Sequence, residues 1–217
     1  MNRSLGRFIL LAMISAHFLF AAHPASAQRA KPKPQWRTYA FDARMSEINI
    51  ILKQDGLMSR RYPTHRVVAK SFSGKIELPP DETKMAVEVI AETKMLTNAD
   101  EAMSDFERKE FHASLRGPIL EADKFPAIKF ISVSVAGLQK IADARSFTLN
   151  GDLTLHGVTK RMAFPVNVTI KEKELRATGE AKLRQSDFGV KPFEKGMGLI
   201  KIGDEVKVSF SIIAKTQ

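Results

Sequence analysis

Residues 146–170 alternate between apolar and polar side chains almost without interruption, and this pattern constrains the fold more than any other feature of the chain. Every second residue is apolar or glycine in two successive runs, at odd positions in 147–155 and at even positions in 162–170. The residues between them in the first run are polar. A period of two places alternate side chains on opposite faces of a pleated strand, one buried and one in water. The segment between the runs, His156-Gly157-Val158-Thr159, breaks the pattern and contains a glycine. The two runs therefore predict a β-hairpin.

The same alternation recurs along most of the chain. The segments with a readable phase predict eight strands, at 48–52, 68–78, 85–91, 128–135, 147–155, 162–170, 175–183 and 206–212. Lys70 is the one residue out of phase within 68–78. About eight antiparallel strands close into a barrel that is either filled by its own side chains or holds one small ligand. A β-sandwich uses the same alternation, so periodicity alone leaves both all-β architectures open.

One segment departs from the strand pattern and predicts a single short helix at about 104–116. Ser104-Asp105-Phe106-Glu107 has the form of a capping box, in which serine and glutamate satisfy exposed backbone N–H groups at a helix start. Gly117-Pro118 is a stop signal. Phe111 and Leu115 are four residues apart, so both would face the sheet. We expect this helix to cap the barrel.

The first 27 residues have the layout of a secretory signal peptide, with cleavage expected after Ala27. Arg3 precedes an apolar run of 15 residues, 8–22, which ends in Ala25-Ser26-Ala27. An uncleaved membrane anchor is the alternative, but a bilayer core needs roughly 20 apolar residues. We therefore expect a periplasmic protein with a flexible basic segment at 28–38 and one domain at 39–217. The chain has no cysteine, so its fold relies on packing without disulfides.

The predicted inward face is apolar and contains many phenylalanines. Ordinary core packing explains such a face, and an apolar cavity for a lipid chain is the sharper hypothesis. Inward glycines at 74, 151 and 179 either leave room for a ligand or mark bends of the barrel. The residues predicted to contact a lipid tail are Ile50, Phe72, Val89, Phe130, Phe147, Phe164, Leu183 and Phe210.

The sequence offers no constellation for catalysis, so we predict a protein that is not an enzyme and carries no cofactor or metal. His65, His112 and His156 lie far apart in the sequence and lack the close spacing of a metal motif. Each is interpreted as a surface or turn histidine. There is no thiol nucleophile, no Gly-x-Ser-x-Gly elbow and no evident pair of acids for acid–base work.

The formal net charge of +10 does not indicate a nucleic-acid-binding protein. Lysine and arginine alternate with glutamate along the outward strand faces, as on a solvated surface. A small basic cluster, Arg60-Arg61 with Arg66 and Lys70, is either a solvated loop or a point of transient contact with an anionic membrane surface.

Five motifs in the expected order resemble those of the YceI-like family. They are the hairpin at 153–160, the segment Ala122–Ser132 after the helix, Ser186-Asp187-Phe188-Gly189-Val190, Phe72-Ser73-Gly74-Lys75-Ile76, and the start at Asp42 and Ser46. Met45 stands where the family often has histidine, and Gln185 stands where an arginine usually precedes Ser-Asp-Phe-Gly. The likeness covers most of residues 39–214.

This resemblance implies an exported bacterial protein with a lipocalin-like barrel of eight antiparallel strands and a helix near one end. It also implies a long isoprenoid chain in an apolar tunnel and no established catalysis. The leading hypothesis is thus a carrier or sequestering protein for an isoprenoid-type lipid, such as a quinone or a polyprenyl phosphate. The alternatives are a filled barrel that serves as an interaction partner for an envelope protein and, least favoured, an enzyme that acts on a bound lipid.

Overall fold

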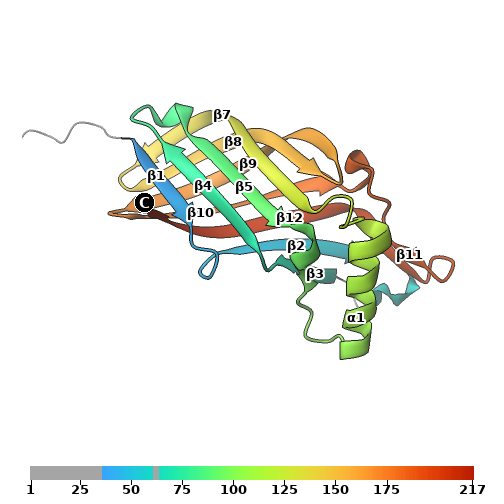
Figure 1. Cartoon of the computed structure of the whole chain (residues 1–217). Coiled ribbons are helices and arrows are strands. Elements are labelled where there is room, and N and C mark those ends of the chain that lie inside the picture. Colours follow the sequence, from blue (N-terminus) through green and yellow to red (C-terminus); the bar gives the residue numbers. More distant parts are fainter. Residues whose placement is uncertain (1–35, 61–63) are drawn as a thin grey trace, which may run out of the picture. The chain divides into compact units, whose positions relative to one another are not determined.

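The computed structural model describes residues 36–60 and 64–217, and Figure 1 shows their arrangement. The predicted signal peptide at 1–27 and most of the predicted basic segment at 28–38 lie outside the described residues. Within the described ranges, no helix has both the length and the apolar character needed to cross a bilayer.

The structure is dominated by antiparallel strands. Their bounds are β1 (Arg37–Phe41), β2 (Glu47–Gln54), β3 (Thr64–Ala69), β4 (Phe72–Leu78), β5 (Ala86–Glu92), β6 (Leu96–Asn98), β7 (Ala127–Ile141), β8 (Ala144–Leu155), β9 (Val158–Lys171), β10 (Glu174–Arg184), β11 (Glu194–Lys195) and β12 (Ile200–Thr216). Short helical turns connect several of them, namely η1 (Leu57–Arg60), η2 (Glu82–Lys84), η3 (Thr93–Met95), η4 (Leu115–Ile119) and η5 (Ser186–Phe188).

Eight of these strands form a closed ring, which confirms the predicted barrel and excludes the sandwich. The neighbours follow the order β1-β4-β5-β7-β8-β9-β10-β12, and β1 pairs in turn with β12. Every pairing in the ring is antiparallel. The predicted hairpin is β8–β9, with Leu155 opposite Val158 and a left-handed backbone at His156 and Gly157 in the turn.

The first part of the barrel wall is broken into pairs of strands that continue one another. β12 pairs antiparallel with both β1, at residues 214–216, and β2, at residues 202–211, so β1 and β2 run in the same direction. The Ser46 hydroxyl holds this break, because it donates to the Asp42 carbonyl (2.7 Å) and accepts from the Ile213 N–H (2.9 Å). The same relation holds between β3 and β4 and between β5 and β6.

The prediction of one strand over 68–78 was wrong, because the structure divides this segment into β3 and β4. The inward parity changes at the break: His65, Val67 and Ala69 are buried in β3, whereas Phe72 and Ile76 are buried in β4. A one-residue change of phase moves each side chain to the other face of a sheet. Lys70, which seemed to be an isolated error of phase, is the exposed residue at this break.

The predicted helix is α1 (Asp105–Ser114), which lies near one end of the barrel (Figure 1), in contact with β6 and, through Phe111, with His65 of β3. Its capping box is formed as expected: Ser104 Oγ accepts from the Glu107 N–H (3.3 Å), and the Glu107 carboxylate accepts from the Ser104 N–H (2.9 Å). The chain continues into η4, a π-helical turn that contains Gly117 and Pro118. Phe111 and Leu115 face the interior as predicted.

Candidate ligand-binding cavity

The barrel encloses a cavity of about 520 Å³, so its interior is not fully packed by side chains. Lining residues come from the barrel strands, from β2 and β3, from α1 and from the segment around β11. Nearly all of them are apolar. The volume falls in the range of small-molecule pockets, which are about 300–1,000 Å³ and are lined mostly by hydrophobic side chains.

Seven of the eight residues predicted to contact a lipid tail line this cavity. They are Ile50, Val89, Phe130, Phe147, Phe164, Leu183 and Phe210. Phe72 does not line it, because it is the first residue of β4 and packs into the core beside the break between β3 and β4. The structure thus brings the predicted set together around one hollow, and their contact with a ligand stays a prediction.

Phenylalanine rings lie over the inward glycines of the barrel wall. A Cβ atom added at Gly179 would be 2.6 Å from Phe210 Cζ, and one added at Gly74 would be 2.6 Å from Phe41 Cε2. Gly151 has the same relation to Phe130. Since the rings occupy the space that a side chain would need, the glycines allow each ring to lie close to the wall. Neighbouring rings also meet edge to face, with 5.3 Å between the centroids of Phe130 and Phe164.

One end of the barrel is closed by buried side chains. Tyr39, Leu78, Leu175 and Ala214 are almost inaccessible to solvent there. The turn η2 lies over the same end, where the Glu82 carboxylate accepts from Arg145 Nε (3.2 Å) and Arg145 Nη2 (3.3 Å) and is 3.2 Å from Lys140 Nζ. Burial opposes ionisation of Glu82, but the hydrogen bonds from Arg145 and Lys140 prevail and lower its pKa.

The polar residues of the cavity lining gather at the opposite end, which we call the mouth. They are Gln54, His65, Glu107, Glu110, Ser114, Gln185 and Lys195. Gln54 ends β2, His65 lies near the start of β3, and Gln185 follows β10. Gln54 and Gln185 are 3% and 9% exposed, so two uncharged amides are buried at the mouth.

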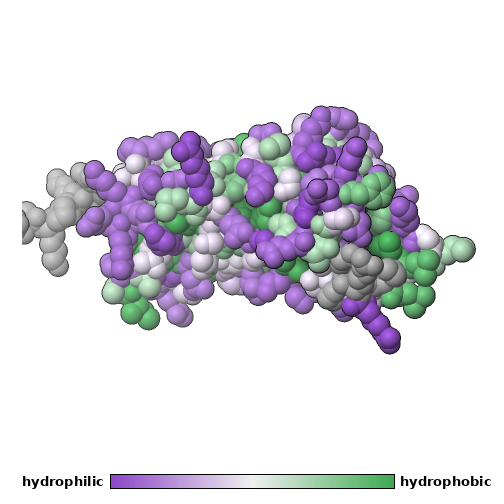
Figure 2. Space-filling view, turned by 90° about the horizontal axis from the view of Figure 1, so that it is seen from below, coloured by the Kyte–Doolittle hydropathy of each residue, from purple (hydrophilic) through white to green (hydrophobic). Residues whose placement is uncertain are grey.

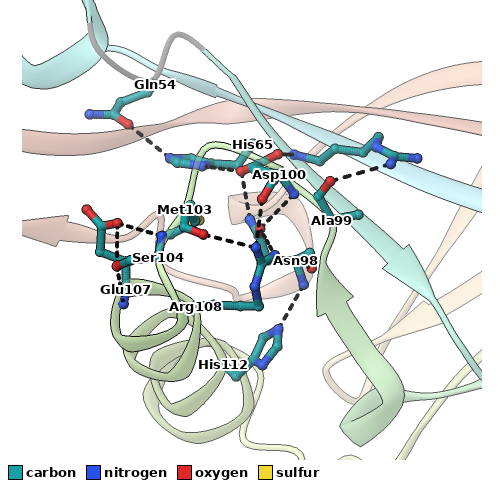
Figure 3. Close-up of polar contacts among 11 residues, drawn as sticks. Gln54, His65, Asn98, Ala99, Asp100, Met103, Ser104, Glu107, Arg108 and His112 are labelled. Carbon is teal, nitrogen blue, oxygen red and sulfur yellow. Dashed lines mark hydrogen bonds and ion pairs between the residues drawn. The ribbon is translucent and has the colours of Figure 1, made fainter.

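A hydrogen-bonded network supports the mouth beside α1 (Figure 3). His65 Nδ1 is 2.8 Å from the Asp100 carboxylate, and His65 Nε2 is 3.0 Å from the Gln54 amide oxygen. Asp100 also accepts from Asn98 Nδ2 (2.7 Å) and from the Arg66 N–H (2.7 Å). The interpretation of His65 as a surface or turn histidine was therefore wrong, since it is a buried strand residue.

The other two histidines have structural roles. His112 Nε2 accepts from the Asn98 N–H (2.9 Å), and burial together with the nearby Arg116 and Arg108 guanidinium groups lowers the pKa of His112. This half-buried residue is on α1, not on the surface or in a turn as predicted. His156 occupies the β8–β9 turn, as predicted, and its Nε2 is 2.8 Å from the Glu121 carboxylate.

The sequence contained a signal for the buried glutamines that strand phasing alone did not use. Gln54 continues the inward parity of Ile50 and Leu52, and Gln185 continues the inward parity of Leu183. Each lies two residues beyond the last apolar residue of its strand, so its side chain falls on the same face. The predicted strands end at 52 and 183, whereas the structure shows that the inward face extends to the two glutamines.

Large apolar side chains are exposed around the mouth. Leu57 of η1, Phe106 of α1, and Met197 and Leu199 of the β11–β12 turn are 79%, 74%, 103% and 48% exposed. We call these four residues the apolar rim. A Cβ added at Gly56 would meet the carbonyls of Gly198 and Leu199, so η1 and the β11–β12 turn are in contact. Figure 2 shows apolar surface gathered at this end of the molecule.

The two ring nitrogens of His65 contact the Asp100 carboxylate and the Gln54 amide oxygen. Within the described part of the chain, no group of three or more histidine, aspartate or glutamate side chains is placed to hold a metal ion. The arrangement that the structure does provide is a barrel that can enclose an apolar molecule and contact its polar end at the mouth.

A closed antiparallel barrel with an apolar hollow and a polar mouth defines the architecture of lipocalin-like binding proteins. Residues 39–214 match the YceI-like domain, so the chain belongs to the YceI-like family.

Curated proteins with a similar sequence are designated UPF0312 proteins. The chain is 32% identical over 143 residues to a UPF0312 protein of Pseudomonas savastanoi pv. phaseolicola, and equally to one of Pseudomonas syringae pv. syringae. Each match covers 63% of this chain and 65% of the relative, so the chain matches slightly less than two thirds of their length.

Solved structures share the fold at low sequence identity. Burkholderia cenocepacia BcnA superposes with a TM-score of 0.63 at 20% identity, over 81% of this chain and 99% of that protein. A polyisoprenoid-binding domain from Saccharophagus degradans, implicated in plant cell wall breakdown, gives 0.61 at 12% identity, over 82% and 98%. The Campylobacter jejuni YceI protein gives 0.53 at 16% identity, over 70% and 84%. These likenesses establish the barrel fold.

Proposed function

We propose that this protein is an exported lipid-binding protein, without catalytic activity, that sequesters or carries an isoprenoid-type lipid in its barrel. The observation that carries the proposal is the apolar cavity of about 520 Å³, which is closed by packed side chains at one end and lined by polar groups at the other. The polyisoprenoid-binding domain from Saccharophagus degradans, which shares this fold, supports the same class of ligand.

The energetics of tail burial suit this function. Each methylene that moves from water into an apolar site contributes about 0.8 kcal/mol. A tail with ten buried methylenes gains roughly 8 kcal/mol before the entropy of association is subtracted. A somewhat longer chain therefore reaches micromolar affinity, for which about 8 kcal/mol of net binding free energy is needed.

The alternative of a filled barrel that acts only through its surface is disfavoured by the cavity itself. Packed protein interiors leave few voids larger than a water molecule. A hollow of about 520 Å³ costs stability unless a ligand fills it. The cavity therefore favours an internal ligand over a barrel that is filled by its own side chains and acts only through its surface.

The proposal includes transient contact with an anionic membrane surface through the mouth. An isoprenoid lipid resides in a bilayer, and passage through water would expose its whole tail. The apolar rim lies where the cavity opens, so its side chains would enter the headgroup region while the hollow faces the lipid. Arg60 is exposed on η1 beside this rim, whereas Arg66 is held by Glu47 (3.1 Å).

Native lipid identification tests the function directly. The protein would be expressed with its leader in a bacterial host, purified without detergent from the periplasmic fraction, and extracted with organic solvent for mass spectrometry. We expect about one isoprenoid-type lipid per protein molecule. A lipid-free protein that also fails to take up a labelled isoprenoid would refute the function. Recovery only from the cytoplasmic fraction would refute export.

A further inference from the structure

Two buried glutamines at the mouth each leave half of an amide group turned to the cavity. Gln185 Nε2 donates to the Gly203 carbonyl (2.9 Å), and the Gln54 amide contacts His65 through its oxygen (3.0 Å). Among the described residues, neither Gln185 Oε1 nor Gln54 Nε2 has a hydrogen-bond partner. Both residues line the cavity and are at least nine-tenths buried. These two amide atoms are therefore available to a ligand that reaches the mouth, where a hydrogen bond to a neutral partner is worth a factor of about 2 to 10 in affinity.

The two amides flank the same strand. Gln54 is opposite Ile202 on one side of β12, whereas Gln185 binds Gly203 from the β10 side. Strands are about 4.8 Å apart, so side chains on either side of β12 are separated by roughly 10 Å. Both amides therefore border the mouth, where the head group of a ligand that fills the cavity can contact either of them. Asp100 contacts one ring nitrogen of His65, and the other ring nitrogen contacts the Gln54 amide oxygen. These contacts fix the orientation of the Gln54 amide.

The buried polar groups at the mouth suit a neutral head group better than an anionic one. Among the described residues, the charged side chains that line the cavity there are Glu107, Glu110 and Lys195, and the Glu107 carboxylate is held by Ser104 in the capping box (2.9 Å). Arg108 is directed away, since its guanidinium donates to the carbonyls of Asn98 (3.2 Å), Asp100 (3.0 Å) and Met103 (3.1 Å). A phosphate buried beside Gln54 and Gln185 would need cationic partners and would instead meet two uncharged amides.

From these observations we infer that Gln54 and Gln185 form a subsite for an uncharged, hydrogen-bonding head group, such as an alcohol or a carbonyl, and that the protein selects neutral isoprenoid lipids over their phosphates. This inference rests on the proposed function and deepens it by naming the chemical class of the ligand. Gln54 and Gln185 contact the head group, and His65 is a positioning residue.

Three probes of equal chain length test the inference: geranylgeraniol, geranylgeranyl phosphate and the hydrocarbon phytane. Each would compete at neutral pH with labelled geranylgeraniol for the lipid-free full-length domain. We expect the alcohol to bind at least ten times more tightly than the phosphate. Equal or tighter binding of the phosphate would overturn the inference.

Variants separate the head-group contacts from the tail contacts. The double change Gln54→Leu with Gln185→Leu should weaken geranylgeraniol about tenfold and leave phytane unchanged, since each lost neutral hydrogen bond is worth a factor of about 2 to 10. The single changes Gln54→Met and Gln185→Met keep side-chain length and should each cost about threefold. An equal loss for alcohol and hydrocarbon would show that the glutamines only maintain the cavity, and would refute the subsite.

A charge reversal on α1 provides a test that leaves the core intact. Glu110 is exposed, so Glu110→Lys should fold normally and shift the ratio of the two affinities toward geranylgeranyl phosphate, relative to geranylgeraniol, by about threefold or more. An unchanged preference would contradict the electrostatic part of the inference. If no probe binds, phytane included, the proposed function fails as well. If phytane binds but the alcohol has no advantage over the phosphate, the subsite alone fails.

Discussion

Replacing Gly179 by alanine tests whether the phenylalanine rings need bare glycine backbone behind them. The new Cβ would lie 2.6 Å from Phe210 Cζ and 2.6 Å from the Pro165 carbonyl oxygen. Gly179 is opposite Phe210 on β12 and opposite Val166 on β9, so both neighbouring strands constrain it. The ring must therefore move toward the hollow, and the strands must separate slightly.

The expected cost is that of overpacking a well-ordered wall, about 1–3 kcal/mol. For a domain of this size, 1 kcal/mol shifts Tm by about 2–4 °C, so a loss of about 2 kcal/mol lowers Tm by about 4–8 °C. Circular dichroism during heating of the lipid-free protein measures this shift. Uptake of a labelled isoprenoid should fall in the same variant, because the displaced ring occupies part of the cavity.

Gly117→Ala is the matched control. No atom lies within 4 Å of a Cβ built at Gly117, so its alanine variant should remain within about 0.5 kcal/mol of the parent. Adding Phe210→Leu to Gly179→Ala should recover part of the loss, since the ring contact is relieved while the Pro165 carbonyl contact stays. The reasoning is refuted if Gly179→Ala and Gly117→Ala have the same Tm.

Three further predictions concern the hollow, the closed end and the mouth. Phe147→Trp should cost less than about 1 kcal/mol in thermal unfolding and weaken lipid uptake; a loss of about 1–3 kcal/mol with unchanged uptake would indicate a filled interior. Glu82→Gln should cost about 3 kcal/mol in urea unfolding at pH 7, because it leaves the Arg145 guanidinium buried without its carboxylate. The pKa of Glu82 is lowered from 4.5, so this stabilisation is present above that value and is lost as pH falls through the lowered pKa; a difference between parent and variant that persists undiminished at pH 2 would contradict the assignment. Met197→Asp should slow lipid transfer from anionic vesicles several-fold, whereas Ile141→Asp, which changes another exposed apolar residue at the end of β7, should not; equal effects would exclude the mouth as the contact surface.

Strand phasing predicted an all-β fold, because most of the eight segments keep one apolar parity over their length, whereas the choice of a barrel over a sandwich came from the family resemblance. It predicted β8 and β9 closely, since those strands are continuous and each has one wet face. It missed the break between β3 and β4, because a phase shift of one residue at Lys70 looks the same in sequence as a single polar substitution. Phasing also missed strand β1 (Arg37–Phe41), because five residues are too few to show a period. This strand begins two residues before the expected start of the domain at 39.

The cavity could be predicted only as a list of inward residues. Whether these residues fill the barrel depends on where each phenylalanine ring lies. The position of a ring depends in turn on which residue is opposite it on the neighbouring strand. Gly179 is opposite Phe210 because β10 pairs with β12 in one particular register, and neither that pairing nor its register can be read from the sequence. The mouth was harder still, since Asp100 reaches His65 from a loop 35 positions away, and nothing local marks either residue as buried.

The pairing of β1 with β12 brings both ends of the described chain to the closed end of the barrel. Gln217 N donates to the Thr38 carbonyl (3.1 Å), while the mouth lies at the far ends of β2 and β10. A tether at the C-terminus would consequently hold the molecule by its base. On a sensor chip, every immobilised copy would point its entrance toward the flowing sample, so capture of lipid from vesicles could be recorded without steric hindrance from the support.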